Sequence, residues 1–254
     1  MVNVTTGVQG RPLVIAHRGA SGVAPENTLA AFRAALAMDV DGVELDYRHT
    51  ADGVPVVMHD ASLLRTTNAA SIWSQRDRAV ADCSLVELAS LDAGSWFGDA
   101  HSFANEALPT LEAALELICG AGRIAVIERK AGDAATLIAL LDRKELMDAV
   151  VVMAFDWSFL ADCHRLTPQL RLVALGEGPL DAEVLQNAQG KHASIIGWNQ
   201  SHLTANEIAS IHTAGMAAWT WTVDDPRRIE QLIFDGIDAI TSNFPDRVVQ
   251  ALTR

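Results

Sequence analysis

Short apolar runs alternate with helical patterns along almost the whole chain. Eight of these runs are rich in β-branched residues and lack a regular polar alternation. They span residues 13–17, 42–47, 124–129, 150–155, 171–175, 193–198, 217–223 and 238–242. Strands that are apolar throughout are typical of a parallel sheet buried on both faces. The pattern therefore predicts an α/β protein built on eight parallel strands.

The segments between these runs show the three-to-four-residue apolar spacing of helices. The clearest examples span residues 27–38, 111–119, 134–144 and 225–236. The last has Asp225 at its cap, Pro226 in its first turn and Gly236 after its end, which are strong boundary signals. Eight strand–helix units indicate a closed (β/α)₈ TIM barrel, and a doubly wound open sheet is the competing architecture.

One segment departs from the alternation of strand and helix. Asp52 and Gly53 stand between two apolar runs, which is a hairpin signal. Residues 54–59 are therefore predicted to form an antiparallel strand that extends the second barrel strand. This fold-back would bring His59 level with Asp46.

Residues 60 to about 108 form a long connection with few periodic runs. Connections of this length in compact domains are usually functional. We interpret this segment as a small insertion that covers the barrel mouth. A chain of 254 residues is ordinary for one such barrel, so we expect a single domain over residues 1–254.

Charge and cysteine content narrow the classes of partner and compartment. The net charge of −13 argues against nucleic acid or an anionic membrane as a general partner. Three scattered cysteines match neither a zinc site nor a disulfide framework, so a reducing cytoplasm is expected. Residues 1–12 lack the features of a signal peptide. No apolar run reaches the roughly 18 residues that a membrane-spanning helix needs.

Two carboxylates lie in the second predicted strand. Glu44 and Asp46 are two residues apart, so they share one face of the strand. Buried carboxylates repel unless a cation or a proton lies between them, and hard divalent cations accept such oxygens. Arginine or lysine partners would satisfy the pair as well, and taken alone the two acids fit a structural pair better.

Another acid lies near the carboxyl end of the third predicted barrel strand. Glu128 is followed by Lys130 on the same face. Active sites of (β/α)₈ barrels lie at the carboxyl ends of the strands. A third carboxylate would complete a metal site beside an anion-binding lysine, and a simple ion pair between Glu128 and Lys130 is the structural alternative.

The first predicted strand ends in His17, Arg18 and Gly19. A histidine can transfer a proton near neutral pH, and an arginine offers a planar fork to a phosphate or carboxylate. Glu26 either holds Arg18 in place or favours the start of the next helix. Together with His59, these residues converge on one barrel mouth, which favours a functional role.

With these motifs in place, the chain resembles the glycerophosphodiester phosphodiesterase family. The resemblance covers nearly the whole chain, and the combination of His-Arg-Gly, Glu-x-Asp and His-Asp is far more specific than any one motif. The segments that carry it are residues 17–32, 44–60, 63–68, 91–97, 108–115, 126–130, 221–226 and 240–246. The fold of the family is a (β/α)₈ barrel with a small insertion after the His-Asp motif.

The resemblance implies hydrolysis of glycerophosphodiesters to glycerol 3-phosphate and an alcohol. In similar enzymes one divalent cation, Mg²⁺ or Ca²⁺, is bound at the positions of Glu44, Asp46 and Glu128. The residues that match His17 and His59 act as general base and general acid, and we expect His17 to be the base, although the reverse assignment stays open.

Further positions follow from the same resemblance. Arg18 and Lys130 match residues that contact the phosphate. Phe155 and Trp221 lie near strand ends, where they either line the glycerol pocket or pack within the barrel. Asn243 departs from the family, which commonly has an aspartate nearby; Arg129 and Ala154 also depart from it. These departures bear on substrate preference and loop conformation.

Two other functions compete with this interpretation. Related barrels cleave phosphatidylinositol or sphingomyelin, and an exposed apolar rim or a membrane anchor would favour that activity. A non-catalytic binding protein would be expected to lack one of the five catalytic and metal-binding positions, and all five are present. The expected partner is a small glycerophosphodiester; the head group, the metal, the nucleophile and homo-oligomer formation stay open.

Overall fold

The computed structural model of the protein describes residues 11–74, 77–98 and 102–253. Residues 1–10, which contribute to the prediction that a signal peptide is absent, lie outside this described part. Among the described helices, none combines the length and apolar character that crossing a membrane requires.

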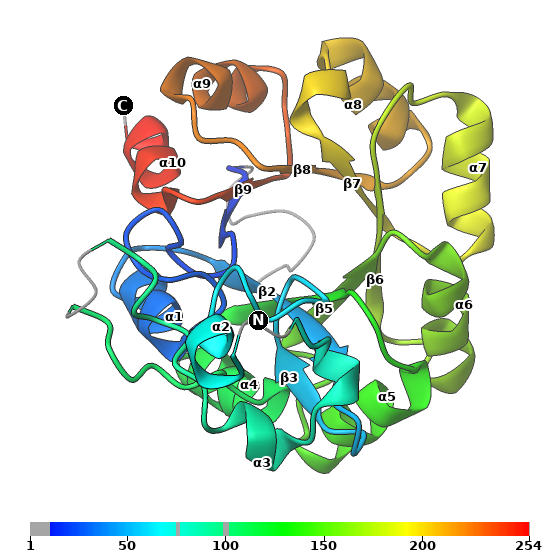
Figure 1. Cartoon of the computed structure of the whole chain (residues 1–254). Coiled ribbons are helices and arrows are strands. Elements are labelled where there is room, and N and C mark those ends of the chain that lie inside the picture. Colours follow the sequence, from blue (N-terminus) through cyan, green and yellow to red (C-terminus); the bar gives the residue numbers. More distant parts are fainter. Residues whose placement is uncertain (1–10, 75–76, 99–101, 254) are drawn as a thin grey trace.

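Eight parallel strands close into a barrel (Figure 1). They are β1 (Leu13–Ala16), β2 (Gly42–His49), β4 (Ile124–Arg129), β5 (Val150–Ala154), β6 (Arg171–Gly176), β7 (Ile195–Asn199), β8 (Ala217–Trp221) and β9 (Ala239–Ser242). Strand β1 pairs with both β9 and β2, which closes the ring. The eight predicted strands and the (β/α)₈ barrel are confirmed, and the open sheet is excluded.

Helices surround this barrel (Figure 1). They are α1 (Leu29–Leu36), α4 (Leu111–Gly120), α5 (Ala134–Arg143), α6 (Trp157–Leu166), α7 (Ala182–Gly190), α8 (Ala205–Thr213), α9 (Pro226–Phe234) and α10 (Pro245–Leu252), with the short η3 (Gln200–His202) before α8. Most begin at a side chain that accepts a hydrogen bond from the first helical turn. Helix α9 has the predicted Asp225 cap and Pro226 start, and α1 is capped by Thr28.

A hairpin extends β2, as predicted, because β3 (Pro55–Val57) pairs antiparallel with it. The register differs from the prediction by one residue. The Met58 N–H donates to the Asp46 carbonyl at 2.9 Å, so Met58 rather than His59 lies opposite Asp46. The reason is that the turn between Thr50 and Val54 contains three residues, whereas the prediction centred it between Asp52 and Gly53.

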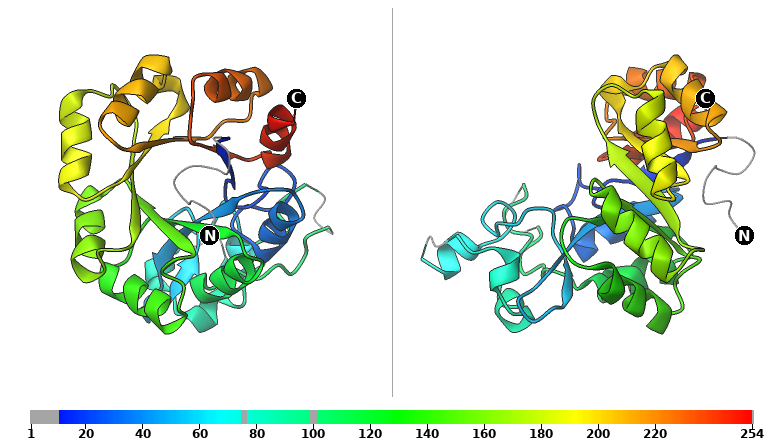
Figure 2. Two further views of the ribbon diagram at one scale, coloured as in Figure 1. Left: turned by 180° about the vertical axis from the view of Figure 1, so that it is seen from behind. Right: turned by 90° about the vertical axis from the view of Figure 1, so that its right-hand side faces the viewer.

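The segment between β3 and α4 projects from one end of the barrel (Figure 2). It contains α2 (Ala69–Ile72), η2 (Val80–Asp82) and α3 (Leu85–Leu88). Its apolar side chains and Val56 of β3 form a separate buried cluster, in which the residues of the segment are Met58, Leu63, Ala69, Val80, Cys83, Leu88, Leu91, Ala93 and Leu108. Its two ends lie side by side, because the Val57 N–H donates to the Pro109 carbonyl at 2.8 Å.

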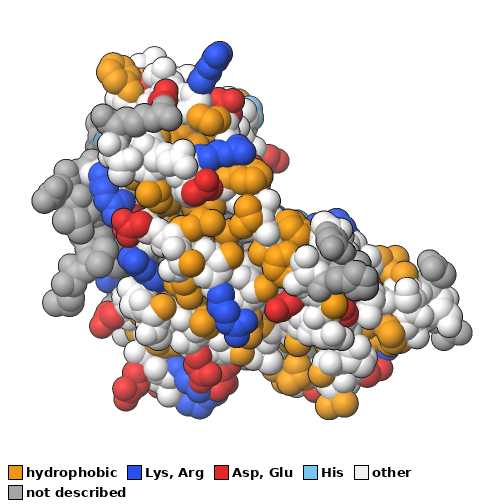
Figure 3. Space-filling model, turned by 90° about the vertical axis from the view of Figure 1, so that its left-hand side faces the viewer, with side chains coloured by type: hydrophobic (Ala, Val, Ile, Leu, Met, Phe, Trp, Pro, Cys, Tyr) orange, Lys and Arg blue, Asp and Glu red, His pale blue; other side chains and the backbone are white. Residues whose placement is uncertain are grey.

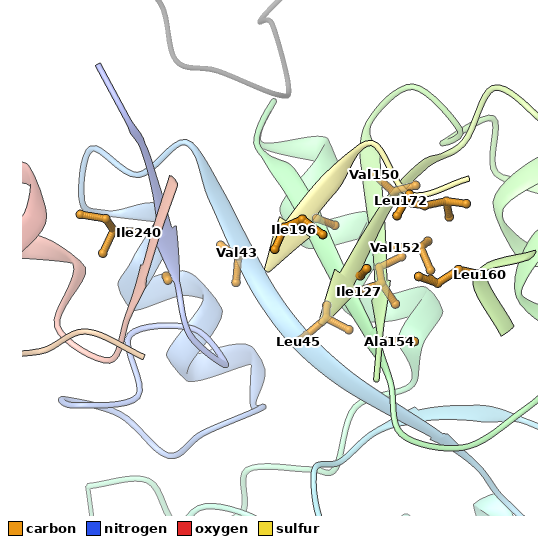
Figure 4. Packing of buried hydrophobic residues seen from close by; sticks show 14 of the residues in the cluster. Val43, Leu45, Ile127, Val150, Val152, Ala154, Leu160, Leu172, Ile196 and Ile240 are labelled. Atoms are coloured by element: carbon orange, nitrogen blue, oxygen red, sulfur yellow. The ribbon is translucent and has the colours of Figure 1, made fainter. Parts of the chain in front are cut away.

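The alternation of side chains along β2 decides which of them face the site. Val43 and Leu45 are buried in the large cluster between the barrel and its helices (Figure 4). Successive side chains of a strand point to opposite faces, so Glu44 and Asp46 point into the barrel. Burial of the apolar outer face thus directs two acids towards the barrel interior.

Candidate active site

A pocket of about 210 Å³ opens at the carboxyl ends of the barrel strands. It is lined by His17, Arg18, Glu44, His59, Glu128, Lys130, Met153, Phe155, Trp221, Thr222 and Thr241. Eight of the ten predicted site residues therefore share one pocket, and the other two, Glu26 and Asp46, both contact Arg18. Larger hollows of about 400 and 390 Å³ lie on the outside of the barrel and contain no predicted site residue.

Three buried carboxylates form the floor of this site. Glu44 and Asp46 belong to β2, and Glu128 lies on β4 directly beside Asp46 in the strand register. One carboxylate oxygen from each residue lies within 4.8 Å of the others. In the described part of the chain, Glu44 Oε1 is buried without a hydrogen-bond partner. Such a set of converging, desolvated oxygens fits a hard divalent cation.

Burial and mutual repulsion shift the titration of these acids. Burial, with the charges of Asp46 and Glu128 nearby, holds the pKa of Glu44 well above its usual range. Burial and Asp46 raise the pKa of Glu128 to about 7. Burial also acts to raise the pKa of Asp46, but Arg18 and Lys130 outweigh it and the pKa is lowered. The cluster thus holds more negative charge than it readily tolerates without a further cation.

Two basic side chains already contact the carboxylates. Lys130 Nζ pairs with Glu128 Oε1 and lies 3.3 Å from Asp46 Oδ1. Arg18 Nε lies 3.1 Å from Asp46 Oδ2. The ion pair between Glu128 and Lys130, which was considered as the structural alternative to a metal site, is therefore present. Glu128 nevertheless also belongs to the carboxylate cluster. Two cations face three carboxyl groups, so full ionisation of all three would leave one negative charge uncompensated.

The turn after β1 presents Arg18 to this cluster. Arg18 and Gly19 both have positive φ angles, of 55° and 83°. A Cβ atom at Gly19 would lie only 2.6–2.8 Å from atoms of Ala31, so glycine is required there. The Arg18 N–H donates to Glu44 Oε2 at 2.8 Å, and its Nη1 donates to Glu26 Oε1 at 2.8 Å. Of the two roles considered for Glu26, the structure shows the contact that holds Arg18.

His17 is oriented by an amide. Its Nδ1 lies 2.7 Å from Asn243 Oδ1, and Asn243 Nδ2 donates to Asp224 Oδ2 at 2.6 Å. Because this arrangement presents the amide oxygen to the ring, Nδ1 carries the proton and Nε2 is left as an acceptor. Burial, together with Arg18, lowers the pKa of His17 to about 4, so the ring is neutral at pH 7.

His59 has a carboxylate partner instead. Its Nδ1 lies 2.6 Å from Asp60 Oδ1, and Arg48 Nε and Nη2 donate to its carbonyl oxygen at 2.9 and 2.8 Å. Burial lowers the pKa of His59, whereas Asp46 and Asp60 act to raise it. The two histidines therefore line one pocket in different electrostatic surroundings.

Aromatic side chains form one wall of the pocket. The rings of Phe155 and Trp221 meet edge to face with centroids 5.5 Å apart, and Lys130 Nζ lies 5.9 Å from the centre of Phe155. Phe155 is 48% exposed, while Trp221 also packs against the apolar barrel interior. Trp221 therefore lines the candidate pocket and also packs within the barrel, and its contact with glycerol stays a prediction. Apolar side chains also gather at the angle between the barrel and the projecting segment (Figure 3).

Several residues of this network were not predicted from the sequence. Asp60 contacts His59, and Arg65 contacts Glu26. Asp224 accepts a hydrogen bond from Asn243. Asn27 Nδ2 also donates to Asp46 Oδ2 at 2.8 Å. The only signal for these residues was their place inside or next to the motifs, because polar loop residues follow no periodic pattern.

Carboxylates, imidazoles and the basic side chains of Arg18 and Lys130 meet at one barrel mouth, and such a set is suited to hydrolysis of a negatively charged ester. The fold and the site therefore define the chain as a barrel hydrolase. The sequence profile described as the glycerophosphoryl diester phosphodiesterase family matches residues 17–247. The chain belongs to this family and is an enzyme of the glycerophosphodiester phosphodiesterase class.

Known proteins similar to the chain span nearly its full length. A glycerophosphodiester phosphodiesterase of Caldanaerobacter subterraneus is 32% identical over 96% of the chain and 99% of the relative. One of Bacillus subtilis is 32% identical over 93% of the chain and 85% of the relative. Among solved structures, a phosphodiesterase of Oleispira antarctica in complex with the product sn-glycerol-3-phosphate is 28% identical to the chain. The match covers 96% of the chain and 98% of the solved chain, with a TM-score of 0.88.

Proposed function

We propose that the chain hydrolyses glycerophosphodiesters to glycerol 3-phosphate and an alcohol, using a divalent cation and two histidines. One observation carries the proposal: three buried carboxylates come within 4.8 Å of one another beside a pocket that both His17 and His59 line. The product bound by the Oleispira antarctica phosphodiesterase supports the choice of product.

Glu44, Asp46 and Glu128 would hold the cation, and their oxygens suit Mg²⁺ or Ca²⁺. A bound cation would act as a Lewis acid towards a phosphoryl oxygen. Arg18 and Lys130 line the same pocket and offer N–H donors to the phosphate oxygens. Such fixed donors stabilise the charge that develops on the phosphate during the reaction.

The surroundings of the two histidines support different roles. His17 is neutral at pH 7, and its Nδ1–H donates to Asn243 Oδ1, so Nε2 is free to take the proton of the nucleophile. Burial lowers the pKa of His59, but the Asp60 carboxylate beside it acts in the opposite direction and favours the protonated ring. An anionic phosphate beside His59 would also act to raise this pKa, and the protonated ring would then donate its proton to the departing alkoxide. We therefore assign His17 as base and His59 as acid.

Two nucleophiles satisfy this scheme, namely water and a hydroxyl of the glycerol itself. Water would transfer its oxygen directly to phosphorus. The glycerol hydroxyl would first give a cyclic phosphodiester that is then opened. Hydrolysis in ¹⁸O-water, stopped early, separates the two routes, because only the second accumulates a cyclic product without ¹⁸O.

The decisive experiment is a coupled assay for glycerol 3-phosphate over a panel of glycerophosphodiesters. We expect activity that EDTA abolishes and that added Mg²⁺ or Ca²⁺ restores. Activity confined to a long-chain lysophospholipid would favour the lipid phosphodiesterase alternative. Binding of the diesters without release of glycerol 3-phosphate would favour the non-catalytic alternative.

We further propose that the chain is a single barrel domain with an insertion at residues 60–108, acting in the cytoplasm on a small-molecule substrate. The three cysteines, Cys83, Cys119 and Cys163, are free, which suits a reducing compartment. The net charge of −13 disfavours a nucleic-acid partner or an anionic membrane surface. Gel filtration with light scattering tests homo-oligomer formation.

A further inference from the structure

The guanidinium of Arg65 lies between two carboxylates at the edge of the site. Arg65 belongs to the projecting segment that follows β3. Its Nη1 and Nη2 atoms donate to the two Glu26 oxygens, both at 2.8 Å. Its Nε and Nη2 atoms donate to the Asp60 oxygens at 2.5 and 3.1 Å. Paired contacts of this kind fix geometry more strictly than a single ion pair does.

Each of these carboxylates also contacts a residue that faces the pocket. Asp60 Oδ1 lies 2.6 Å from His59 Nδ1. Glu26 Oε1 accepts a hydrogen bond from Arg18 Nη1 at 2.8 Å. One guanidinium therefore joins, through one carboxylate on each side, the histidine assigned as acid and the arginine assigned to the phosphate.

We propose that Arg65 is a positioning residue of the phosphodiesterase reaction, which orients His59 through Asp60 and Arg18 through Glu26. The inference rests on the proposed function, because it uses the roles assigned there to His59 and Arg18. It also gives the projecting segment a part in catalysis.

A purely structural role does not account for this arrangement as well. The Arg65 side chain is 45% exposed, and ion pairs that are so open to water contribute little to folding stability. Without Arg65, however, Glu26 and Asp60 would lose a shared cation. Glu26 would then depend on Arg18 alone, and Asp60 would be free to turn away from His59. Loss of Arg65 should therefore affect the reaction far more than the fold.

The test compares Arg65→Ala with Arg78→Ala on two substrates at saturating Mg²⁺. Arg78 is the matched control, since it lies in the same segment and pairs with Glu87 at 2.8 Å, away from the pocket residues. Removal of partners beyond the contacting residues commonly costs about 10–100-fold in activity. We expect a loss of that size in kcat/KM for glycerophosphocholine with Arg65→Ala and near wild-type activity with Arg78→Ala.

The second substrate is the p-nitrophenyl ester of glycerol 3-phosphate. Its phenolate departs without a proton, so displacement of His59, the assigned acid, should lower the activity on this ester less. We expect the fold-loss in kcat/KM caused by Arg65→Ala to be at least several times smaller on this ester than on glycerophosphocholine. We also expect added guanidinium ion to raise the activity of Arg65→Ala but not that of the wild type or of Arg78→Ala.

Arg65→Ala activity equal to that of Arg78→Ala on both substrates would overturn the inference, as would equal losses on both substrates without guanidinium rescue. If circular dichroism shows Arg65→Ala to be unfolded, Arg65→Lys replaces it. Lysine keeps the charge but cannot form both paired contacts, so the same preference for the ester is expected, and its absence would overturn the inference. A wild type that releases no glycerol 3-phosphate would instead contradict the proposed function.

Discussion

The two histidines of the pocket differ in what holds their Nδ1 atoms. His17 faces the amide oxygen of Asn243, whereas His59 faces the carboxylate of Asp60. A neutral amide oxygen fixes the tautomer and stabilises the charged ring only weakly, whereas a carboxylate fixes the tautomer and stabilises the charged ring more strongly. Differences between single neighbouring side chains thus give two residues of identical chemistry different surroundings, which suits the different roles proposed for them.

Exchanging the amide and carboxylate behind His17 should shift the pH dependence of activity. In the double variant Asn243→Asp with Asp224→Asn, a carboxylate would face Nδ1 and an amide would lie behind it. The pKa of His17 should then rise from about 4 by about one unit or more. Since the base must be neutral, kcat/KM at saturating metal should begin to fall at a higher pH than in the wild type. An unshifted acid limb would contradict the role of His17 as base.

Removal of either imidazole should eliminate most of the turnover. General acid–base catalysis contributes about 10²–10⁴-fold, so His17→Ala and His59→Ala should each lower kcat by about that factor. His212→Ala is the control, because His212 lies outside the pocket and pairs with Asp238 at 2.8 Å. Glycerol 3-phosphate release measures the effect, and circular dichroism checks the fold. Near-full activity in either site variant would exclude that histidine from catalysis.

At the scale of elements, the sequence predicts the strands well because their burial on both faces leaves long apolar runs. It places Glu44 and Asp46 on one face because side chains two positions apart on a strand point the same way. It misplaces the register of the β2–β3 hairpin by one residue, because Asp52 and Gly53 fit turns of two or three residues. It misses Arg65, whose partner Glu26 lies 39 positions away and follows no repeat.

The turn after β1 should tolerate no side chain at Gly19. In Gly19→Ala, the new Cβ would meet Ala31 at 2.6–2.8 Å in addition to the strain of a positive φ. Gly53→Ala is the matched control, since Gly53 has a φ of 78° but no atom within 4 Å of the added Cβ among the described residues. Strain alone costs about 1–2 kcal/mol. Urea denaturation should show a clearly larger loss for Gly19→Ala; equal losses would show that the clash is relieved.

At the scale of the whole molecule, the site makes the fold sensitive to pH in the absence of metal. The pKa of Glu128 is about 7 in the folded chain, against an ordinary value of 4.5. A carboxyl group whose pKa is raised by folding contributes its full stabilisation at pH values below its ordinary pKa. This stabilisation is lost as the pH rises through the folded-state pKa near 7. The folded state thus carries an electrostatic cost at neutral pH that a bound cation would offset.

This cost should be measurable as a change in unfolding free energy. Between pH 4.5 and pH 8, in EDTA, the contribution of Glu128 should fall by an amount on the order of 3 kcal/mol. Glu128→Gln cannot ionise, so its unfolding free energy from urea titrations should decline less over the same range. Identical pH profiles for the two proteins would contradict the raised pKa. Saturating Mg²⁺ should reduce the decline in the wild type.

The neighbouring ends of the projecting segment have an evolutionary consequence. Val57 and Pro109 are hydrogen-bonded to each other, and the segment between them has its own buried cluster. A module that leaves and re-enters a scaffold at one point can lengthen, shorten or be replaced without changing the ring beneath it. Variation in the alcohol that is accepted could therefore arise in the part of this module that follows Arg65, while His59 and Arg65 near its start and the acids of the ring stay where they are.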